Sequence, residues 1–389
     1  MDAKSIKLYI ITPWYNVFAG GAEVLARNLA EQSAERKIQT EVLTTCVLTP
    51  EDSWWKDSLK PGVQKIGNVT VRRFSVNNTG EYEYNLAQNR ALMGQELSEK
   101  DKETLYTCGI NSDDLVEHVA GLPDDSLIIT IPYYQSLAYN VIKKNRGKVY
   151  LMPCFHNEDR FYWNQVKDML LYSRGIYFLS EPEKELAIRT YGKVLGEKII
   201  EAPVTGAGIE RSEAQSLVEN LPKKYVLYVG RKDRGKGIVE LLAYHSQMKR
   251  DIPLVLVGGG DRGLVPENSR IIDYGFVTEE EKNYIIKNAA CMVNLSNNES
   301  FSFVIMEAWL NSIPVIVSGR CDVTKHHVEL SKGGLIIKNA NEYEAALNAI
   351  LENKEIGRSM GTRGKKYVMD NYSWDHVIAN IIMEHRGKL

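Results

Sequence analysis

Long hydrophobic runs are absent from this sequence. Its longest apolar stretches, such as 254–257 and 313–317, have the length of a β-strand, whereas a membrane helix needs about 20 apolar residues. Cysteine is also scarce: the five cysteines are widely spaced and include no C-x-x-C pair, which argues against a disulfide framework and a zinc site. The first residues lead into a strand pattern without the basic and apolar segments of a secretion signal. We therefore expect a cytoplasmic protein without a metal site.

An excess of charge of one sign is lacking too. The 48 basic and 50 acidic residues leave a net charge of −2, so the whole surface offers no field that would collect nucleic acid. Hydrophobic content of 44% and charged content of 25% are ordinary for a globular protein and exclude disordered and fibrous classes. The 389 residues suffice for two domains with separate cores.

Apolar β-branched runs alternate with helix-period segments along most of the chain, which predicts parallel sheets covered by helices. One series begins with a strand at 6–12, a loop at 13–21 and a helix at 22–34, and a second begins at Tyr225. We therefore predict an α/β fold of two Rossmann-like doubly wound domains that face each other across a cleft. Ligands would bind beyond the carboxyl ends of the strands. Turn residues at 203–208 mark the linker.

Four loops that follow predicted strands can present backbone N–H groups to an anion, although glycine in a loop often serves only a tight turn. They are Gly20-Gly21-Ala22-Glu23, Gly230-Arg231, 258–261 and 299–302. The segment 230–237 nearly matches a nucleotide phosphate loop, but Gly237 replaces the hydroxyl residue that binds magnesium. What remains is a pair of cations, Arg231 and Lys236, between a strand and a helix.

Glu299 and Glu307 stand eight residues apart around the start of a predicted helix at 301–311. Glu307 lies two turns into this helix among apolar residues, where an unpaired carboxylate would be costly to bury. The alternative is an exposed glutamate on a polar helix face. If it is buried, Glu307 should have a cationic or hydroxyl-bearing partner.

The segment from Tyr225 to Val317 resembles the C-terminal domain of retaining glycosyltransferases of the GT-B fold, family 4 type (glycosyl transferases group 1). The matching pieces keep that family's order: Val229-Gly-Arg, Lys236-Gly, Leu256-Val-Gly-Gly-Gly, Tyr274-Gly-Phe-Val, the Glu299 and Glu307 pair, and Ile313-Pro-Val-Ile-Val-Ser. The amino-terminal half is similar more loosely, through Gly20-Gly-Ala-Glu, Phe155-His-Asn-Glu and Leu179-Ser-Glu.

This resemblance implies the domain division. Residues 1–205 with 373–389 would form an acceptor-binding domain, because Tyr372-Ser-Trp-Asp-His resembles the last helix of the family, which crosses back to the first domain. Residues 206–372 would bind a nucleotide-sugar donor.

The resemblance also implies roles for individual residues. Arg231 and Lys236 would hold the donor diphosphate and stabilise the leaving group without a metal or other cofactor. Glu299 and His156 would lie at the sugar, and Glu307 would bind the ribose. The other implied donor contacts come from Gly20 and Gly21 near the phosphates, Gly275, Phe276 and Val277 at the base, and the backbone of Ser302, Phe303 and Val304 at the sugar.

One departure concerns the loop under the sugar, where the family commonly has glycine at the position of Ser302 and often at Ser300. A serine there would narrow the pocket or add a hydroxyl contact. Retention by double displacement needs a carboxylate nucleophile, and no candidate stands out. The resemblance therefore favours front-face attack, in which the departing phosphate takes the acceptor proton.

The function implied is transfer of a hexosyl group to a saccharide or lipid-linked acceptor in polysaccharide biosynthesis, with UDP-glucose or another UDP-hexose preferred as donor. GDP-mannose, a nucleotide-sugar epimerase and a binding protein without turnover are the alternatives. No nucleic-acid partner is expected.

The roles of two further segments are left undecided by the sequence. The segment 54–103, with one predicted strand at 69–74, suits an insertion or a mobile cover, and its aromatic residues either stack on sugars or anchor the insertion. The basic cluster 143–148 suits either peripheral contact with an anionic membrane or a solvated turn.

Overall fold

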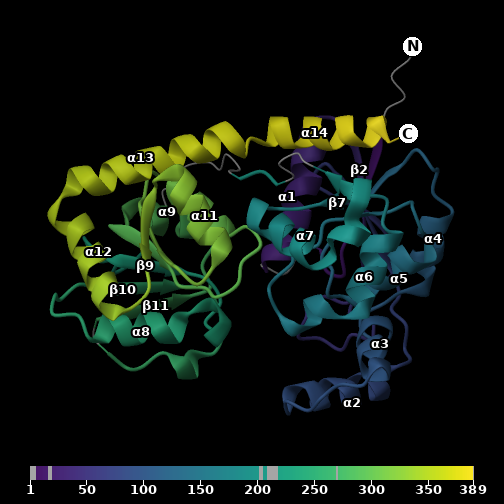
Figure 1. Ribbon diagram of the computed structural model, residues 1–389, viewed down its shortest axis with the longest axis horizontal. Coiled ribbons are helices and arrows are strands. Elements are labelled where there is room, and N and C mark those ends of the chain that lie inside the picture. The colour runs from purple at the N-terminus through teal and green to yellow at the C-terminus, as the bar shows by residue number, and fades with distance from the viewer. Residues whose placement is uncertain (1–5, 16–19, 201–204, 208–217, 269, 389) are drawn as a thin grey trace. The chain divides into compact units, whose positions relative to one another are not determined.

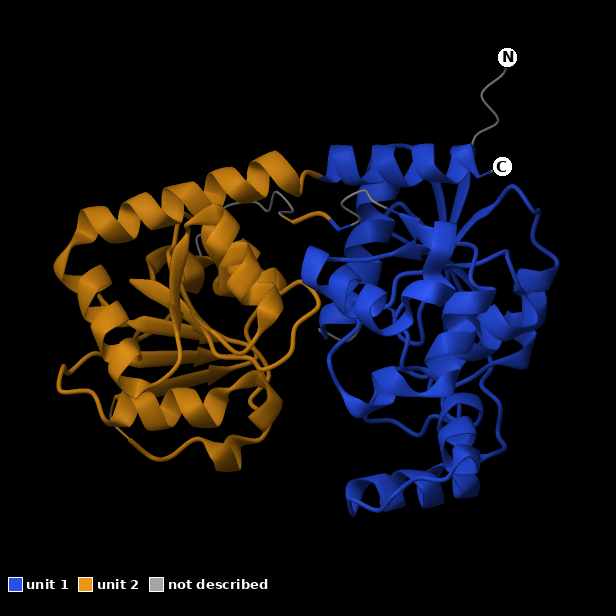
Figure 2. Ribbon diagram, in the orientation of Figure 1, with its two compact units in different colours: residues 1–205, 374–389 blue, residues 206–373 orange. Residues whose placement is uncertain are grey.

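The computed structural model describes residues 6–15, 20–200, 205–207, 218–268 and 270–388 (Figure 1). The chain divides into two compact units: unit 1 comprises Met1–Thr205 with Trp374–Leu389, and unit 2 comprises Gly206–Ser373 (Figure 2). Of the predicted linker at 203–208, only residues 205–207 are among those described. Each unit has its own sheet and helices, which confirms the predicted α/β class with two sheets.

Unit 1 is built on an eight-stranded sheet with the order β3-β4-β2-β1-β5-β6-β7-β8. All neighbouring strands are parallel except β3 and β4, which form an antiparallel hairpin at one edge. The strands are β1 (Lys7–Ile11), β2 (Gln39–Thr45), β3 (Gly62–Ile66), β4 (Val69–Phe74), β5 (Leu127–Thr130), β6 (Tyr150–Leu151), β7 (Ile176–Tyr177) and β8 (Ile199–Ile200).

The helices of unit 1 pack a largely aliphatic and aromatic core against this sheet. They are α1 (Gly21–Glu35), α2 (Glu81–Leu92), α3 (Glu99–Thr107), α4 (Asp113–Ala120), α5 (Ser136–Lys144), α6 (Asn164–Tyr172), α7 (Glu181–Leu195) and α14 (Trp374–Gly387). Helix α14 belongs to this unit although it follows the whole of unit 2 in the sequence. It buries Trp374, Val377 and Ile381, and Nδ1 of His385 lies 3.1 Å from the hydroxyl of Tyr150 on β6.

The segment 54–103 is more regular than its sequence indicates. It contains the β3–β4 hairpin and α2 and enters α3, where the sequence predicts one short strand. The sequence gives no signal for β3 because four of its five residues are exposed and no apolar face is present. The rings of Trp54 and Trp55 lie 5.6 and 5.4 Å from that of Tyr84. These contacts indicate that Trp54, Trp55 and Tyr84 anchor the insertion rather than stack on a sugar. Tyr82, in contrast, is 75% exposed.

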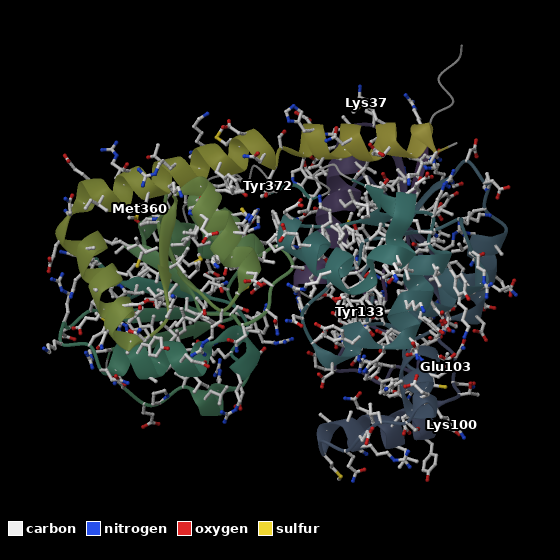
Figure 3. The ribbon with its side chains drawn as sticks, in the orientation of Figure 1. Lys37, Lys100, Glu103, Tyr133, Met360 and Tyr372 are labelled. Carbon is white, nitrogen blue, oxygen red and sulfur yellow. The ribbon has the colours of Figure 1, made fainter. Side chains whose placement is uncertain are left out.

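Glu103 on α3, which is labelled in Figure 3, forms hydrogen bonds with side chains of two neighbouring helices of unit 1, α5 and α6. Its carboxylate accepts hydrogen bonds from Lys143 Nζ at 2.7 Å and from Gln165 Nε2 at 3.0 Å. Lys143, the first lysine of the basic cluster 143–148, is therefore neutralised by an ion pair within the unit.

Unit 2 contains a six-stranded, fully parallel sheet with the order β11-β10-β9-β12-β13-β14. Its strands are β9 (Val226–Val229), β10 (Leu254–Val257), β11 (Ile271–Gly275), β12 (Cys291–Asn294), β13 (Val315–Ser318) and β14 (Gly334–Ile337). Its helices are α8 (Ile238–Ser246), α9 (Glu279–Asn288), α10 (Phe303–Leu310), α11 (Asp322–Ser331), α12 (Ala340–Glu352) and α13 (Lys354–Asn371). None of the described helices is both long enough and apolar enough to cross a membrane.

The central strand β9 lies between β10 and β12. Because all strands run in the same direction, the loops that follow β9, β10, β11 and β12 leave the sheet at its carboxyl edge. The charged and glycine-rich segments of the sequence occupy these loops.

Candidate active site

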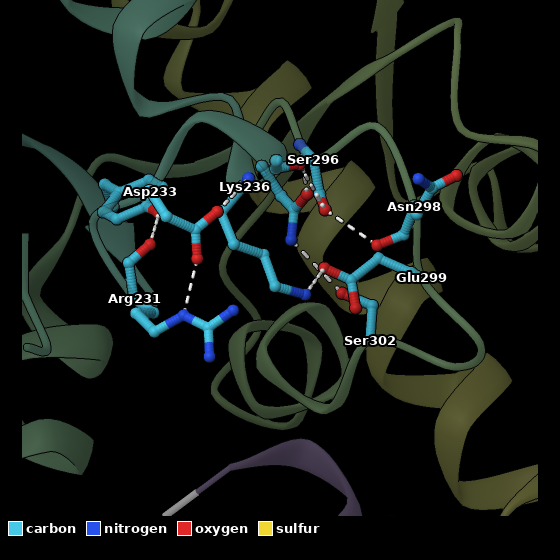
Figure 4. A network of polar contacts seen from close by, with 10 residues as sticks. Arg231, Asp233, Lys236, Ser296, Asn298, Glu299 and Ser302 are labelled. Atoms are coloured by element: carbon cyan, nitrogen blue, oxygen red, sulfur yellow. Dashed lines mark hydrogen bonds and ion pairs between the residues drawn. The ribbon is translucent and has the colours of Figure 1, made fainter. Parts of the chain in front are cut away.

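A compact group of charged side chains lies at the carboxyl edge of the unit 2 sheet (Figure 4). Lys236 ends a short 3-10 turn after β9, and its Nζ lies 2.9 Å from Oε1 of Glu299 in the loop after β12. Nε of Arg231 lies 2.5 Å from Oδ2 of Asp233, whose other oxygen caps the turn by accepting the backbone N–H of Lys236 at 2.9 Å. The loops of two adjacent strands thus hold two cations and two carboxylates.

Gly237 sets how closely these two loops approach. Its φ is 71°, and a Cβ atom at this position would lie 2.0 Å from the carbonyl oxygen of Leu295. The backbone N–H of Asn297 also donates to the carbonyl of Gly235 at 3.0 Å. The close contact between the two loops therefore requires glycine at 237. A nucleotide phosphate loop instead requires a hydroxyl residue at this position.

Ser302 precedes α10 in a left-handed conformation with φ of 70° and ψ of 73°. This backbone explains why glycine suits the position. The serine side chain is buried, and its Oγ accepts a hydrogen bond from Asn294 Nδ2 at the end of β12, at 3.2 Å. The hydroxyl therefore points toward the sheet and holds the loop in place.

Replacing Ser302 by alanine should destabilise unit 2 by about 1–2 kcal/mol, because the strained backbone remains while a buried amide loses its acceptor. Ser302→Gly should be nearly neutral, because the relieved strain offsets the lost hydrogen bond. Urea unfolding of both variants beside the wild type measures the contrast. Equal destabilisation by both would show that Ser302 stores no backbone strain.

Glu307 lies in the second turn of α10 and faces α9. Its side chain is 28% exposed, so it is neither the fully buried nor the fully exposed glutamate that the sequence left open, and its Oε1 accepts a hydrogen bond from Lys282 Nζ at 2.9 Å, which supplies a cationic partner. Burial would lower the pKa of Lys282, but the carboxylates of Glu307 and Glu279 raise it above its usual value. Oε2 of Glu307 is enclosed and accepts no hydrogen bond from any described residue.

Lys232 is a buried cation that the sequence does not single out, because it stands within a run of charged residues. Its side chain is 1% exposed, and its Nζ bonds the carbonyl of Gly258 and lies 3.0 Å from Oδ1 of Asp273. Its backbone pairs with that of Gly260. Lys232 therefore fixes the glycine loop after β10 to its neighbouring strands.

The predicted base-binding segment is the end of β11 and the residues after it. Gly275 has φ of 66°, and its carbonyl accepts the N–H of Gly258 at 2.7 Å. Phe276 is 75% exposed, and its ring packs against Gly259. A Cβ atom at Gly259 would lie 2.3 Å from this ring and would clash with it. Val277 is half-buried. The segment thus presents an aromatic side chain beside the glycine loop.

His156, in the loop after β6 of unit 1, is half-buried. The loop is held by Glu183, whose two carboxylate oxygens accept the backbone N–H groups of Phe155 and Leu179, each at 2.5 Å. Burial raises the pKa of Glu183 to about 8, and these hydrogen bonds act in the opposite direction. Glu183 therefore positions the loop that carries His156. It lies just after the sequence motif at 179–181, and that motif does not identify it.

Gly20 caps the N-terminus of α1, and Gly21 is the first residue of that helix. A Cβ atom at Gly21 would meet no atom of the described residues within 4 Å. The N–H groups of a first helical turn have no partner within the helix. Residues 16–19 of the preceding loop lie outside the described ranges.

The structure therefore places the predicted residues in two sets. Arg231, Lys236, Glu299 and Ser302 lie together in unit 2, where Phe303 and Val304 begin α10 and Glu307 lies one turn further. Gly20, Gly21 and His156 lie in unit 1: Gly20 precedes α1, Gly21 begins it, and His156 lies in the loop after β6. Among the described residues, no group of three or more His, Cys, Asp or Glu side chains is arranged to hold a metal ion.

His327 on α11 supports the loop before α10. Its ring lies 5.4 Å from that of Phe301, next to Ser302, and its Nδ1 is 2.9 Å from the hydroxyl of Tyr367. Burial lowers the pKa of His327 to about 3, and the charge of His326 acts in the same direction.

Acid should destabilise unit 2 through His327. In the unfolded chain, His327 has its ordinary pKa of about 6.5. Its contribution to the free energy of unfolding is therefore complete above that pH and is lost as the pH falls toward the lower pKa of the folded state. Between pH 7 and pH 5 we expect a loss of about 2 kcal/mol from this residue. Urea unfolding at both pH values should show that loss for the wild type and for the control His376→Gln, which replaces an exposed histidine of α14. His327→Gln should lack it, and an unchanged pH dependence in that variant would contradict the assignment.

Comparison with known proteins identifies relatives for part of the chain. Residues 210–367 match the family model described as Glycosyl transferases group 1. An uncharacterized glycosyltransferase of Methanocaldococcus jannaschii is 27% identical over 187 residues, 43% of this chain and 47% of the relative. An alpha-1,3/1,6-mannosyltransferase of Dictyostelium discoideum is 24% identical over 188 residues, 41% of this chain and 44% of the relative. The chain thus spans less than half the length of these curated relatives.

Solved structures match nearly the whole chain. Sucrose-phosphate synthase from Thermosynechococcus elongatus has a TM-score of 0.69 and 21% identity, with 98% of each chain covered. An E. coli trehalose-6-phosphate structure bound with UDP-2-fluoro glucose has a TM-score of 0.72 and 14% identity, with 97% of this chain and 98% of that chain covered. At such identities the likeness concerns the fold, which is that of the GT-B glycosyltransferases.

Proposed function

We propose that this chain is a retaining hexosyltransferase that moves a sugar from a nucleotide-sugar to a saccharide or lipid-linked saccharide acceptor in polysaccharide biosynthesis. The observation that carries the proposal is the pairing of Lys236 with Glu299 at 2.9 Å beside Arg231, at the carboxyl edge of a parallel sheet. Ligands of parallel α/β sheets bind at this edge. The match of residues 210–367 to glycosyl transferases group 1 supports the same assignment.

In this proposal, Arg231 and Lys236 hold the donor diphosphate, and the start of α10 adds the positive end of a helix dipole. Negative charge grows on the leaving phosphate as the glycosidic bond breaks, and the two cations stabilise it. These side chains do the work that a divalent cation does in metal-assisted phosphate chemistry. Activity should therefore persist in EDTA.

The unit 1 residues keep the roles that the resemblance implies. Gly20 and Gly21 approach the donor phosphates, and His156 lies at the sugar. A lipid-linked acceptor would bring the protein into peripheral contact with a membrane.

The chemical step we propose is front-face transfer. The acceptor oxygen forms a bond to the anomeric carbon as the bond from that carbon to the phosphate oxygen breaks, and the acceptor proton passes to the departing phosphate. Glu299 holds sugar hydroxyls and keeps Lys236 in place. A glycosyl-enzyme adduct recovered by rapid quench and peptide mapping would overturn this step, because adduct formation requires a carboxylate nucleophile.

Glu307 would bind the ribose, so Glu307→Gln should raise the donor KM about tenfold and change kcat much less, because a hydrogen bond to a charged group contributes about 1.5 kcal/mol or more. Initial rates over a range of donor concentrations measure both constants. The matched control is Glu279→Gln, which removes the other carboxylate near Lys282, at 2.8 Å. An equal rise in KM for both variants would assign the effect to Lys282 and contradict ribose binding.

Donor choice rests on two relatives that point in different directions. The E. coli neighbour is bound with UDP-2-fluoro glucose, whereas the Dictyostelium relative is a mannosyltransferase. We favour a UDP-hexose, with UDP-glucose first. Thermal denaturation with a panel of UDP and GDP sugars tests this choice, because only a bound donor stabilises the fold. A shift with GDP-mannose alone would establish the mannosyltransferase alternative.

An epimerase or a binding protein without turnover would also bind the donor. Product analysis separates these functions. An epimerase converts the donor without an acceptor, a transferase releases the nucleotide only when it glycosylates an acceptor, and a binding protein does neither.

A further inference from the structure

A second concentration of positive charge lies at the opposite edge of the unit 1 sheet from His156. A cavity of about 640 Å³ is lined there by five cationic side chains and one carboxylate: Lys144, Arg146, Lys148, Arg174, Lys388 and Asp124. These residues precede β5, β6 and β7 or follow α14, so they lie at the amino ends of the strands. We call this cavity the amino-edge pocket. Its volume lies in the range of small-molecule sites, roughly 300–1,000 Å³.

The positive charge of the amino-edge pocket is only partly balanced by carboxylates. Asp124 lies 3.4 Å from Lys148, and Lys144 is paired with Glu117 at 2.9 Å. The guanidinium of Arg174 donates to the backbone carbonyls of Asp124 at 3.1 Å and of Lys388 at 3.1 Å. A carbonyl accepts a hydrogen bond but does not neutralise a cation, so an excess of positive charge remains on the lining. The chain as a whole has a net charge of −2, so this excess is local.

Several of these cations are held in place before any ligand arrives. Lys148 Nζ donates to the carbonyls of Ala120 at 3.0 Å and Leu122 at 2.5 Å. The guanidinium carbon of Arg146 lies 3.8 Å from the centroid of the Tyr172 ring. A fixed guanidinium retains N–H donors for a second partner, since it carries five. Fixed cations lose little side-chain entropy when an anion binds.

We propose that the amino-edge pocket binds a phosphate-bearing anion. Phosphate is the matching chemistry because its oxygens accept several hydrogen bonds at once and its charge suits a cluster of lysine and arginine. The phosphate belongs either to a soluble molecule or to a lipid headgroup. The inference does not rest on the proposed transferase activity, because no residue of the pocket belongs to the candidate active site.

The test uses the full chain with Arg231→Gln and Lys236→Gln, so that the donor-site cations cannot bind the probe. Into this background we would introduce Lys144→Gln with Arg146→Gln, two exposed residues of the pocket. The matched control is Lys65→Gln with Lys167→Gln, which removes the same charge from exposed positions elsewhere in unit 1. Thermal melting of each variant checks that the fold is retained.

Two binding arms distinguish the sources of the phosphate. Calorimetric titration with inorganic pyrophosphate at constant ionic strength tests a soluble ligand, and sedimentation with vesicles containing phosphatidylglycerol tests a lipid headgroup. We expect the pocket variant to bind at least one probe at least tenfold more weakly than the control does. A loss in the first arm assigns a soluble phosphate and a loss in the second arm a headgroup. Equal binding by the pocket variant and the control in both arms would overturn the proposal.

Discussion

Replacing Glu299 by alanine should lower kcat by about two to three orders of magnitude, the usual loss when one group that acts on the transition state is removed. Glu299 lies 2.9 Å from Lys236 and is 13% exposed, so its removal would release Lys236 from its position and delete the contact to the sugar that we propose. The free energy of unfolding should change little, because partly exposed ion pairs contribute about 0–1 kcal/mol. Initial rates and urea unfolding measure the two effects separately.

The control for this prediction is Glu352→Ala, which breaks another ion pair of unit 2, with Arg250 at 2.6 Å, on α12. It should leave kcat unchanged. The double variant Glu299→Ala with Lys236→Gln should lose less than the product of the single losses, because the two side chains act as a unit. If Glu299→Ala retains the wild-type rate, the transferase mechanism is wrong in assigning a role to this carboxylate.

Gly237→Ala should destabilise unit 2 by at least about 3 kcal/mol, because overpacking against backbone cannot be relieved by a rotamer change. The new Cβ atom would lie 2.0 Å from the carbonyl oxygen of Leu295, and a φ of 71° adds strain. Relief of the clash would move the loop after β9 away from the loop after β12. Donor binding should therefore fall along with stability, as seen by urea unfolding and by the thermal shift with donor.

Gly94→Ala is the matched control for the cost of placing alanine in a left-handed backbone conformation. Gly94 has φ of 68°, and a Cβ atom there would meet no atom within 4 Å. This variant should lose only the cost of a left-handed alanine, about 1–2 kcal/mol. Similar losses for the two variants would mean that the close approach at Leu295 is relieved without cost.

The sequence predicts unit 2 better than unit 1 for a physical reason. The strands of unit 2 are short apolar runs separated by glycine and charged loops, so β9 to β13 and the site residues Arg231, Lys236 and Glu299 are all visible as a pattern. Strand β3 has no buried face to produce a pattern. Lys282 and Lys232 are also hidden, because their roles depend on partners 25 and 41 residues away, Glu307 and Asp273. Such long-range pairing leaves no local signal.

The conformation of Ser302 illustrates the same limit. The resemblance marks the position as unusual because glycine is common there, and the structure gives the cause, a left-handed φ of 70°. The hydrogen bond from Asn294, eight positions earlier, could not be inferred from spacing alone.

The return of α14 to unit 1 has a consequence for biosynthesis. Trp374, Val377 and Ile381 complete the interior of unit 1 but follow the whole of unit 2 in the chain. A ribosome must therefore synthesise unit 2, which is one continuous segment, before the other unit has all its parts. Unit 2 can fold first as it emerges, while the apolar surface that α14 covers in unit 1 stays exposed until the last residues are made.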